Sequence, residues 1–288
     1  MGIQRICACA KKMKVRKNMR IYIVTDMEGS AGIINFADWV TARGKYYEQG
    51  KIFLTEEINA CIRGFCDACD EKGEKVEEIL VVDGHGEGGI NTELLDSRAS
   101  LASNWPRPPY PFSADSRFDV AANIGQHAKA GSEYSHITHT GWFNVLDMKI
   151  NGISVGEYGC TVFTAGELGV PMIYASGERA FCKEAAELTP WTVTTEVKRG
   201  VMPGKGDECT TEQYMNRNLG AVHLSPIRAR ELIYEDSKRA MEMYLEDKAQ
   251  FEAYKLDAPY KLEKWDRNGS CLKLESDVSV TDLLNKQY

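Results

Sequence analysis

Short apolar runs alternate with amphipathic stretches along the chain from residue 19 to about residue 200. The runs with strand character occupy residues 20–25, 78–82, 118–124 and 171–175. Helical spacing of apolar positions is found over residues 46–70 and 157–168. Strands that alternate with helices build βαβ units, in which helices cover a mainly parallel sheet. The pattern therefore predicts an α/β fold of three layers with a mainly parallel central sheet.

The pattern changes after Val201. A polar stretch with two glycines comes first, and we then expect a long charged helix over residues 226–252 and strands near 260–264 and 270–275. This C-terminal helix-and-strand excursion suggests a subdomain of its own. The predicted organisation is a basic N-terminal extension at 1–18, an α/β core at 19–200 and a C-terminal subdomain at 201–288.

Two short signals predict irregular or tightly turned segments. The nonapeptide NWPRPPYPF at residues 104–112 contains four prolines, which exclude regular structure and predict a rigid surface loop. Asn151-Gly152 lies at the centre of residues 146–155, and this dipeptide is the strongest short signal for a two-residue hairpin turn. We therefore expect a β-hairpin there.

The bulk composition limits the function. With 43% hydrophobic and 27% charged residues the chain has the composition of a globular protein, and no apolar run reaches the roughly 18 residues of a membrane span. The net charge of −7 argues against a nucleic-acid surface, because phosphate binding needs clustered Lys and Arg. We expect an enzyme with a small substrate, and neither nucleic acid nor a membrane as a partner.

The first eighteen residues differ from the rest, because they carry six basic side chains and no acid. The apolar stretch at residues 6–10 is too short for a signal peptide and precedes most of the charge. We therefore expect a disordered extension; the alternative is that Met19 is the functional start.

Nine cysteines are an odd count without a secretory signal, which favours a reducing compartment, the cytoplasm, and free thiols. Cys61, Cys66 and Cys69 match the spacing of an iron–sulfur ligand set. They fall, however, in one predicted amphipathic helix with Thr55 as its N-cap and Gly73 after its end. Since a continuous helix cannot turn three thiolates onto one cluster, we expect these cysteines to pack in the core.

The stretch DGHGEGG at residues 83–89 contains G-x-G-x-x-G after a predicted strand, which raises the question of a dinucleotide site. Such a site also needs an acidic residue at the end of the next strand, about 20 residues on. Residues 103–106 occupy that position, where we expect a loop without a strand and find no acid. We therefore expect the glycines to let the backbone approach His85 and a substrate.

Metal-ligand residue types follow three neighbouring predicted strands. Asp26 and Glu28 come directly after the first strand, His85 after the second and His127 after the third. The carboxyl ends of parallel strands share one edge of a sheet, where ligands bind in open α/β folds. Two carboxylates so close together repel unless a cation holds them, and imidazole with carboxylate suits zinc, with manganese or cobalt as alternatives. The sequence predicts a metal site at this edge.

The order and spacing of several motifs resemble the zinc-dependent D-aminopeptidases of peptidase family M55, the DppA type. The resemblance spans about residues 19–232 and rests on Asp26-Met27-Glu28-Gly29, Thr55-Glu56-Glu57-Ile58-Asn59, Asp83-Gly84-His85, residues 125–131, His139-Thr140, Asn151-Gly152 and Gly156-Glu157. It implies a dinuclear aminopeptidase that cleaves short peptides with an N-terminal D-residue. It also implies a ring-shaped homo-oligomer, a decamer by analogy.

By the same resemblance, two zinc ions per chain are held by Asp26, Glu28, His85, His127 and Glu157. The catalytic histidine falls on His139, although counting forward from His127 leaves His136 open. We expect His223 to be a packed or surface residue outside this group, and the aromatic side chains of Trp142 and Phe143 either to line the pocket or to pack in the core.

The sequence departs from the family pattern in places. Gln126 stands where an aromatic residue is usual, and Gly177-Glu178 replaces Gly-Asp. We also expect residues 201–220 to be an expanded region and the chain to stop before the family's last helix. Two other functions stay open. The same ligands serve two-metal phosphoesterases, although few basic residues lie near the motifs. A closed, non-catalytic site in a metal-stabilised assembly module is the other alternative.

Overall fold

The apolar strands seen in the sequence form one seven-stranded sheet in the computed structural model, which describes residues 18–105 and 107–288. Its order is β3-β2-β1-β4-β7-β8-β9, and every neighbouring pair is parallel except β8 with β9. The strands are β1 (Asn18–Thr25), β2 (Lys75–Asp83), β3 (Ala99–Ala102), β4 (Val120–Gln126), β7 (Met172–Glu178), β8 (Val193–Gly200) and β9 (Ala221–His223). The predicted basic extension at 1–18 lies outside the described residues except for Asn18, where β1 begins.

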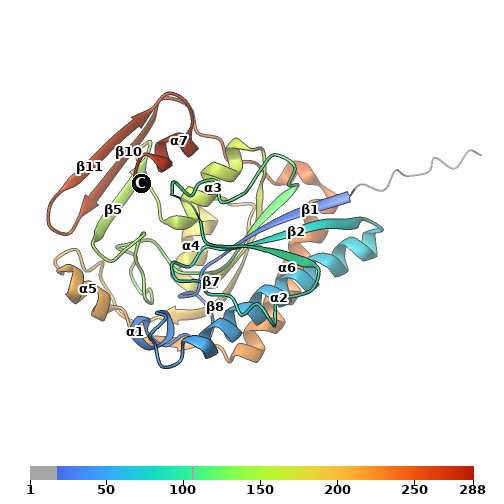
Figure 1. The fold of residues 1–288 in the computed structure, drawn as a ribbon, viewed down its shortest axis with the longest axis horizontal. Coiled ribbons are helices and arrows are strands. Elements are labelled where there is room, and N and C mark those ends of the chain that lie inside the picture. The colour runs from blue at the N-terminus through green and yellow to red at the C-terminus, as the bar shows by residue number, and fades with distance from the viewer. Residues whose placement is uncertain (1–17, 106) are drawn as a thin grey trace, which may run out of the picture.

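Helices cover both faces of this sheet (Figure 1). Ile21 and Ile23 of β1 face a core formed with α2 (Tyr47–Lys72) and α6 (Pro226–Glu246), whereas Tyr22 and Val24 face a second core. The second core includes α3 (Glu157–Glu167) and α4 (Arg179–Leu188). Alternate residues of a strand point to opposite faces, so a buried strand is apolar on both sides. The predicted three-layer α/β fold is confirmed.

A smaller sheet carries the C-terminal strands, in the order β11-β10-β5-β6. Its hairpin joins β5 (Val145–Ile150) to β6 (Ile153–Ser154) through Asn151 and Gly152, whose φ angles are +48° and +82°. These left-handed conformations explain the Asn-Gly pair and confirm the predicted hairpin. The last elements of the predicted C-terminal subdomain are β10 (Tyr260–Asp266), β11 (Cys271–Ser276) and α7 (Val280–Asn285). Of these, β10 pairs with β5 and so joins the smaller sheet (Figure 1).

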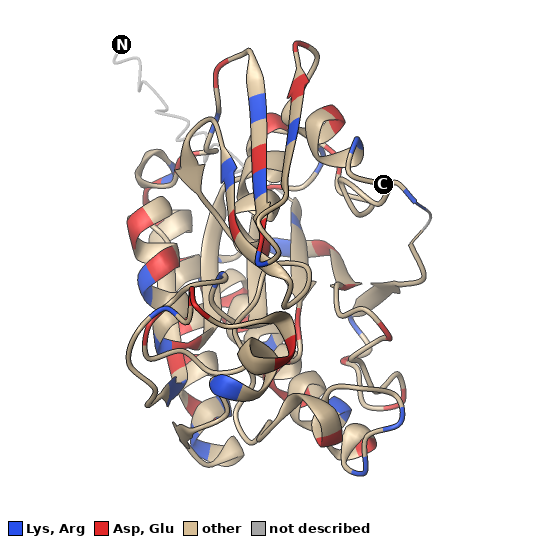
Figure 2. Ribbon diagram, turned by 90° about the vertical axis from the view of Figure 1, so that its left-hand side faces the viewer, with Lys and Arg blue, Asp and Glu red and all other residues tan. Residues whose placement is uncertain are grey.

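Short elements complete the chain: α1 (Phe36–Trp39), α5 (Thr211–Arg217) and the 3₁₀ helix η1 (Lys248–Gln250). None of the helices within residues 18–105 and 107–288 is long and apolar enough to cross a membrane. Charges of both signs are mixed along the described ribbon (Figure 2). The ion pairs Lys238–Glu71 and Lys72–Glu246 link α6 to α2 at 2.6 and 2.7 Å, where exposure to water keeps each contribution small.

Two local predictions were wrong, and one strand was not predicted. Thr55 is no N-cap, because α2 begins eight residues earlier; its hydroxyl donates to the Lys51 carbonyl and accepts from the Asn91 amide. The edge strand β3 at residues 99–102 was not predicted, whereas residues 103–105 after it carry no strand, as expected. The helix predicted over 226–252 ends at Glu246, since Asp247 is extended and its side chain caps η1. The three cysteines do lie buried in the continuous helix α2.

Candidate metal centre

The ends of three adjacent strands bring the predicted ligands together. In the sheet β1 lies between β2 and β4, and Thr25, its last residue, pairs with Asp83 of β2 and Ile124 of β4. Asp26 and Glu28 follow β1, His85 follows β2, and His127 follows β4. All four side chains are buried, and they lie close together, as expected from the common edge of parallel strands.

Two glycines allow the turns after β1 and β4 to pack backbone against backbone. A Cβ atom at Gly29 would lie 2.0 Å from the Gln126 carbonyl oxygen, and one at Gly125 would lie 2.2 Å from the Asp26 carbonyl oxygen. Gly125 also has a φ of +75°, a conformation that favours glycine. This close contact sets the distance between the carboxylates after β1 and the imidazole of His127.

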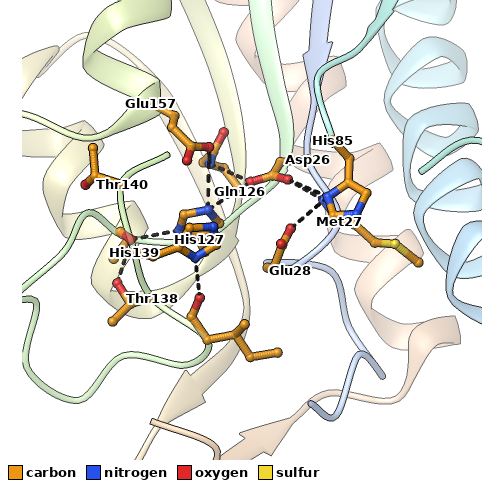
Figure 3. A network of polar contacts seen from close by, with 12 residues as sticks. Asp26, Met27, Glu28, His85, Gln126, His127, Thr138, His139, Thr140 and Glu157 are labelled. Carbon is orange, nitrogen blue, oxygen red and sulfur yellow. Dashed lines mark hydrogen bonds and ion pairs between the residues drawn. The ribbon is translucent and has the colours of Figure 1, made fainter. Parts of the chain in front are cut away.

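Asp26 lies between two imidazoles (Figure 3). Its Oδ1 is 3.4 Å from Nδ1 of His85, and its Oδ2 is 3.2 Å from Nε2 of His127. Glu28 Oε2 is 3.2 Å from the same His85 nitrogen. One carboxylate thus turns an oxygen to each side of the site, which is the geometry that a ligand bridging two metal ions requires.

Glu157 completes the group from a different layer of the fold. It is the first residue of α3, and its Oε2 lies 3.5 Å from His127 Nε2. Its Oε1 accepts a 2.7 Å hydrogen bond from the Gly141 amide. Gln126 joins the two sides, since its Nε2 donates to Asp26 Oδ2 at 2.7 Å and to Glu157 Oε2 at 3.3 Å.

Backbone carbonyls orient each histidine of the site. His85 Nε2 contacts the Val40 oxygen at 2.8 Å, His127 Nδ1 the Ala128 oxygen at 2.8 Å, and His139 Nδ1 the Ile137 oxygen at 2.9 Å. A ring nitrogen that donates to a carbonyl leaves the other nitrogen with a lone pair. Ligating histidines are usually held in this way, so the arrangement prepares the second nitrogen to bind a cation.

Burial and charge oppose each other in the cluster. Burial alone lowers the pKa of the His85 and His127 imidazoles, but Glu28 and Asp26 beside His85, and Glu157 and Asp26 beside His127, raise both pKa values well above the usual value. Burial raises the pKa of Asp26, yet His127 and His85 lower it well below the usual range. The carboxylates therefore favour a positive charge beside them at this buried site, which either a protonated imidazole or a bound cation supplies.

The donor set fits divalent metal ions. Asp26, Glu28 and His85 form one group, and His127, His139 and Glu157 form another; within each group one donor atom per residue lies within 4.8 Å of the others. Glu28 Oε2 and His127 Nε2 are buried and make only the ion-pair contacts with His85, Asp26 and Glu157; neither atom has a hydrogen bond in the described part of the chain. Buried polar atoms are normally paired, so two such atoms facing the same site indicate a ligand that completes them.

The structure separates the two candidate catalytic histidines. The ring of His139 stacks on His127 with 4.0 Å between centroids, and Phe143 lies 4.4 Å away on another side. Burial, and the nearby His127, lower the pKa of His139. His136 lies elsewhere: its Nε2 contacts the Ile34 oxygen at 3.0 Å, and its ring meets His223 edge-on at 5.3 Å. His223 thus lies outside the cluster, as expected.

Replacing His136 by Gln is expected to flatten the loss of stability in acid. Burial, and the positive charge of Lys198, lower the pKa of His136 to about 2 in the folded protein. The unfolded chain binds this proton near pH 6.5, so stability falls as pH drops below that value. Between pH 7 and pH 5, His136 lowers the free energy of unfolding by about 2 kcal/mol. Chemical denaturation of both proteins at the two pH values measures the difference.

The comparison of variant with wild type isolates this effect, because other buried groups act in the opposite direction. Burial raises the pKa of Glu57 and of Glu178 to about 7. Each of these carboxyls therefore lowers the stability of the folded protein as pH rises. Both acids are present in wild type and variant, so their contributions cancel in the difference between the two proteins. Identical pH slopes for wild type and variant would contradict the predicted role of His136.

A cavity of about 700 Å³ opens in front of the cluster. Asp26, Glu28, His85, His139 and Glu157 line it, together with Phe36, Thr41 and Trp142. Trp142 and Phe143, the two aromatic residues that follow His139 and Thr140, have different environments. Trp142 lines the cavity and is 47% exposed, whereas Phe143 is 1% exposed and packs in the core.

The glycine-rich loop presents His85 to this cavity. Asp83 accepts the Gly89 amide at 2.9 Å, and Gly88 donates to the His85 carbonyl at 2.9 Å, so the loop folds back on itself. A Cβ atom at Gly84 would lie 2.5 Å from the Thr25 carbonyl oxygen. These contacts agree with the expectation that the glycines allow a close backbone approach beside His85.

Sequence reasoning missed the buried groups that support the ligands. Lys198 is 1% exposed, and its ammonium donates to the carbonyl oxygen of Glu28. Glu178 accepts from the Ala128 amide at 3.0 Å and from the His136 amide at 2.6 Å. The unusual Gln126 and Glu178 were the available signal, because each departs from the family pattern where the side chain contacts the site.

Similar proteins fit this picture. The family model for M55 peptidases, described as D-aminopeptidase, matches residues 19–268. A D-aminopeptidase of Bacillus subtilis (strain 168) is 33% identical over 189 residues, so the match spans 64% of this chain and 65% of that protein. The solved structure of the Zn-dependent D-aminopeptidase DppA from Bacillus subtilis, a self-compartmentalizing protease, has a TM-score of 0.78 at 24% identity, over 93% of this chain and 96% of that one.

Proposed function

This chain belongs to the M55 peptidase family, and on that basis we propose that it is a zinc-dependent aminopeptidase acting on short peptides with an N-terminal D-amino acid. The observation that carries the proposal is the position of Asp26, whose two oxygens face the two imidazoles of His85 and His127. Three carboxylates and two imidazoles, with one of the carboxylates facing both imidazoles, suit a pair of zinc ions.

The residues that would hold the ions are Asp26, Glu28, His85, His127 and Glu157, and the Asp26 carboxylate faces the imidazoles of both donor groups. When bound, the ions supply Lewis-acid polarisation of the scissile carbonyl and activation of water near neutral pH. Gln126 holds Asp26 and Glu157 in place by donating to both. The Lys198 ammonium fixes the backbone of the turn that presents Glu28.

His139 is the proposed proton-transfer group. The Ile137 carbonyl orients its ring, and its lowered pKa keeps the imidazole neutral near pH 7, so it can accept a proton there. His139 lines the cavity together with Glu157. From this position His139 would donate the proton to the leaving amine of a bound peptide. Alternatively, the free ring nitrogen of His139 would attack the scissile carbonyl, the C–N bond would break with departure of the amine, and water would hydrolyse the acyl-imidazole; the expected loss on substitution is large in both cases.

Assembly is part of the proposal. The DppA structure is that of a self-compartmentalizing protease, and we propose that this chain likewise forms a homo-oligomer, ring-shaped and decameric by analogy. Sedimentation velocity of the purified chain tests this separately from activity.

The direct test combines elemental analysis with a peptide assay. For protein purified without chelator we expect about two zinc ions per chain, and release of D-Ala but not L-Ala from matched dipeptides. Dialysis against a chelator should abolish release, and added zinc should restore it. Hydrolysis of a phosphate monoester without peptide cleavage would instead favour the phosphoesterase alternative. Two bound ions with no turnover of either substrate would favour a closed structural site.

A further inference from the structure

The lining of the active-site cavity includes two basic side chains that the metal centre does not use. Arg107 belongs to the proline-rich loop after β3, and Lys264 to β10 of the small sheet. Both line the cavity that holds Asp26, His85 and Glu157. The sequence separates them by more than 150 residues, so only the fold brings them to the same space.

The cavity wall around both cations is tied together by specific contacts. In the proline-rich loop the Trp105 indole donates to the Asp83 carbonyl at 3.0 Å, and Tyr110 exchanges two hydrogen bonds with Asn285 of α7 at 3.1 and 3.0 Å. Lys264 lies on the same face of β10 as the fully buried Leu262. This wall is therefore built from a loop, a strand and a helix that hold one another.

Neither cation is neutralised by an acid within residues 18–105 and 107–288. Arg107 lies over the ring of Tyr288, with 5.4 Å from Cζ to the centroid, and the Lys264 ammonium donates to Gln287 Oε1 at 3.1 Å. In contrast, Lys261 and Lys273 on the small sheet each pair with a glutamate. Two cations that face a cavity without an acidic partner are available to an anionic ligand.

We propose that Arg107 and Lys264 bind the free C-terminal carboxylate of the peptide whose N-terminal bond is cleaved at the metal centre. This rests on the proposed function. A short peptide carries an ammonium group at one end and a carboxylate at the other, and the lining of the cavity contains both acidic groups and these two cations. A guanidinium donates two parallel hydrogen bonds to a carboxylate, and the ammonium adds a point charge.

The inference limits the substrate to peptides that reach both the metal ligands and the two cations. A peptide with its carboxylate blocked, or one too long for its end to lie beside Arg107, loses this contact while its N-terminal bond still meets the metal ligands. A phosphate group has the same attraction to these cations, so the experiment includes a phosphate substrate.

The experiment measures kcat/KM for one dipeptide in two forms, the free acid and the C-terminal amide, with the zinc-loaded full chain. We expect the free acid to be preferred roughly tenfold to a hundredfold, the range for hydrogen bonds to a charged group. In R107M and K264M the ratio of acid to amide should fall towards one, with activity on the amide retained. K261M is the matched control: Lys261 is on the same strand and points to the opposite face, so its ratio should not change.

The outcomes separate the two proposals. A wild-type ratio near one, or a preference that both substitutions leave intact, would overturn the carboxylate subsite and keep the aminopeptidase. No release from either form, with a phosphate monoester hydrolysed and R107M impaired on it, would overturn the peptide function and assign the cations to phosphate. A shift in thermal midpoint of R107M or K264M relative to K261M identifies a folding defect, in which case the conservative R107K and K264R variants should restore the acid preference.

Discussion

Replacing Asp26 by Asn should reduce the zinc content of the protein and lower kcat/KM by about 10³-fold, because several kcal/mol of metal-assisted catalysis are lost. The carboxylate faces His85 through one oxygen and His127 through the other, at 3.4 and 3.2 Å. An amide of the same shape offers only one acceptor and no charge, so both groups of donors lose a shared anion. Elemental analysis and steady-state kinetics on the same sample measure the two effects.

The matched control is Asp236→Asn. Asp236 is a hydrogen-bonded carboxylate on α6 that accepts from the Thr195 hydroxyl at 2.8 Å, and it does not line the active-site cavity. This variant should keep full metal content and activity. If D26N also kept two ions and wild-type turnover, Asp26 would be a structural residue and the metal centre would have to be placed elsewhere.

The sequence predicted the edge of the sheet on which the site lies. The succession of strands and helices, and the residues directly after each strand, can be recognised from short stretches of sequence. Four apolar runs and the helices between them are typical of parallel βαβ units, and parallel strands end at a common edge. Asp26, Glu28, His85 and His127 follow these strands directly. Their proximity therefore depended only on the order of the strands, which the structure gives as β2-β1-β4.

The remaining parts of the site depend on packing between layers, which periodicity does not encode. Glu157 reaches the cluster from the start of α3, and only the family resemblance pointed to it. Lys198 is one of several polar residues in β8, and nothing in its neighbours indicates that it is buried under Glu28. Arg107 and Lys264 share a cavity only because β10 pairs with β5 beside the proline-rich loop.

Replacing His139 by Ala should lower kcat by about 10²- to 10⁴-fold, the usual range for loss of a proton-transfer group, while the protein keeps its zinc. The imidazole lines the cavity, its Nδ1 is fixed by the Ile137 carbonyl at 2.9 Å, and its lowered pKa keeps it neutral near pH 7. A group that moves a proton should also leave a mark on the pH profile of kcat. We therefore expect the acidic limb of that profile to disappear in the variant.

The position of His139 allows one other role, and metal content distinguishes the two. Its donor atom lies within 4.8 Å of those of His127 and Glu157, so it is close enough to be a ligand itself. A fall from two ions to one in H139A would assign it to the metal. H136Q is the control, since His136 contacts Ile34 and His223 instead of the cavity and should keep both zinc and turnover. Wild-type activity in H139A with a loss in H136Q would reverse the assignment.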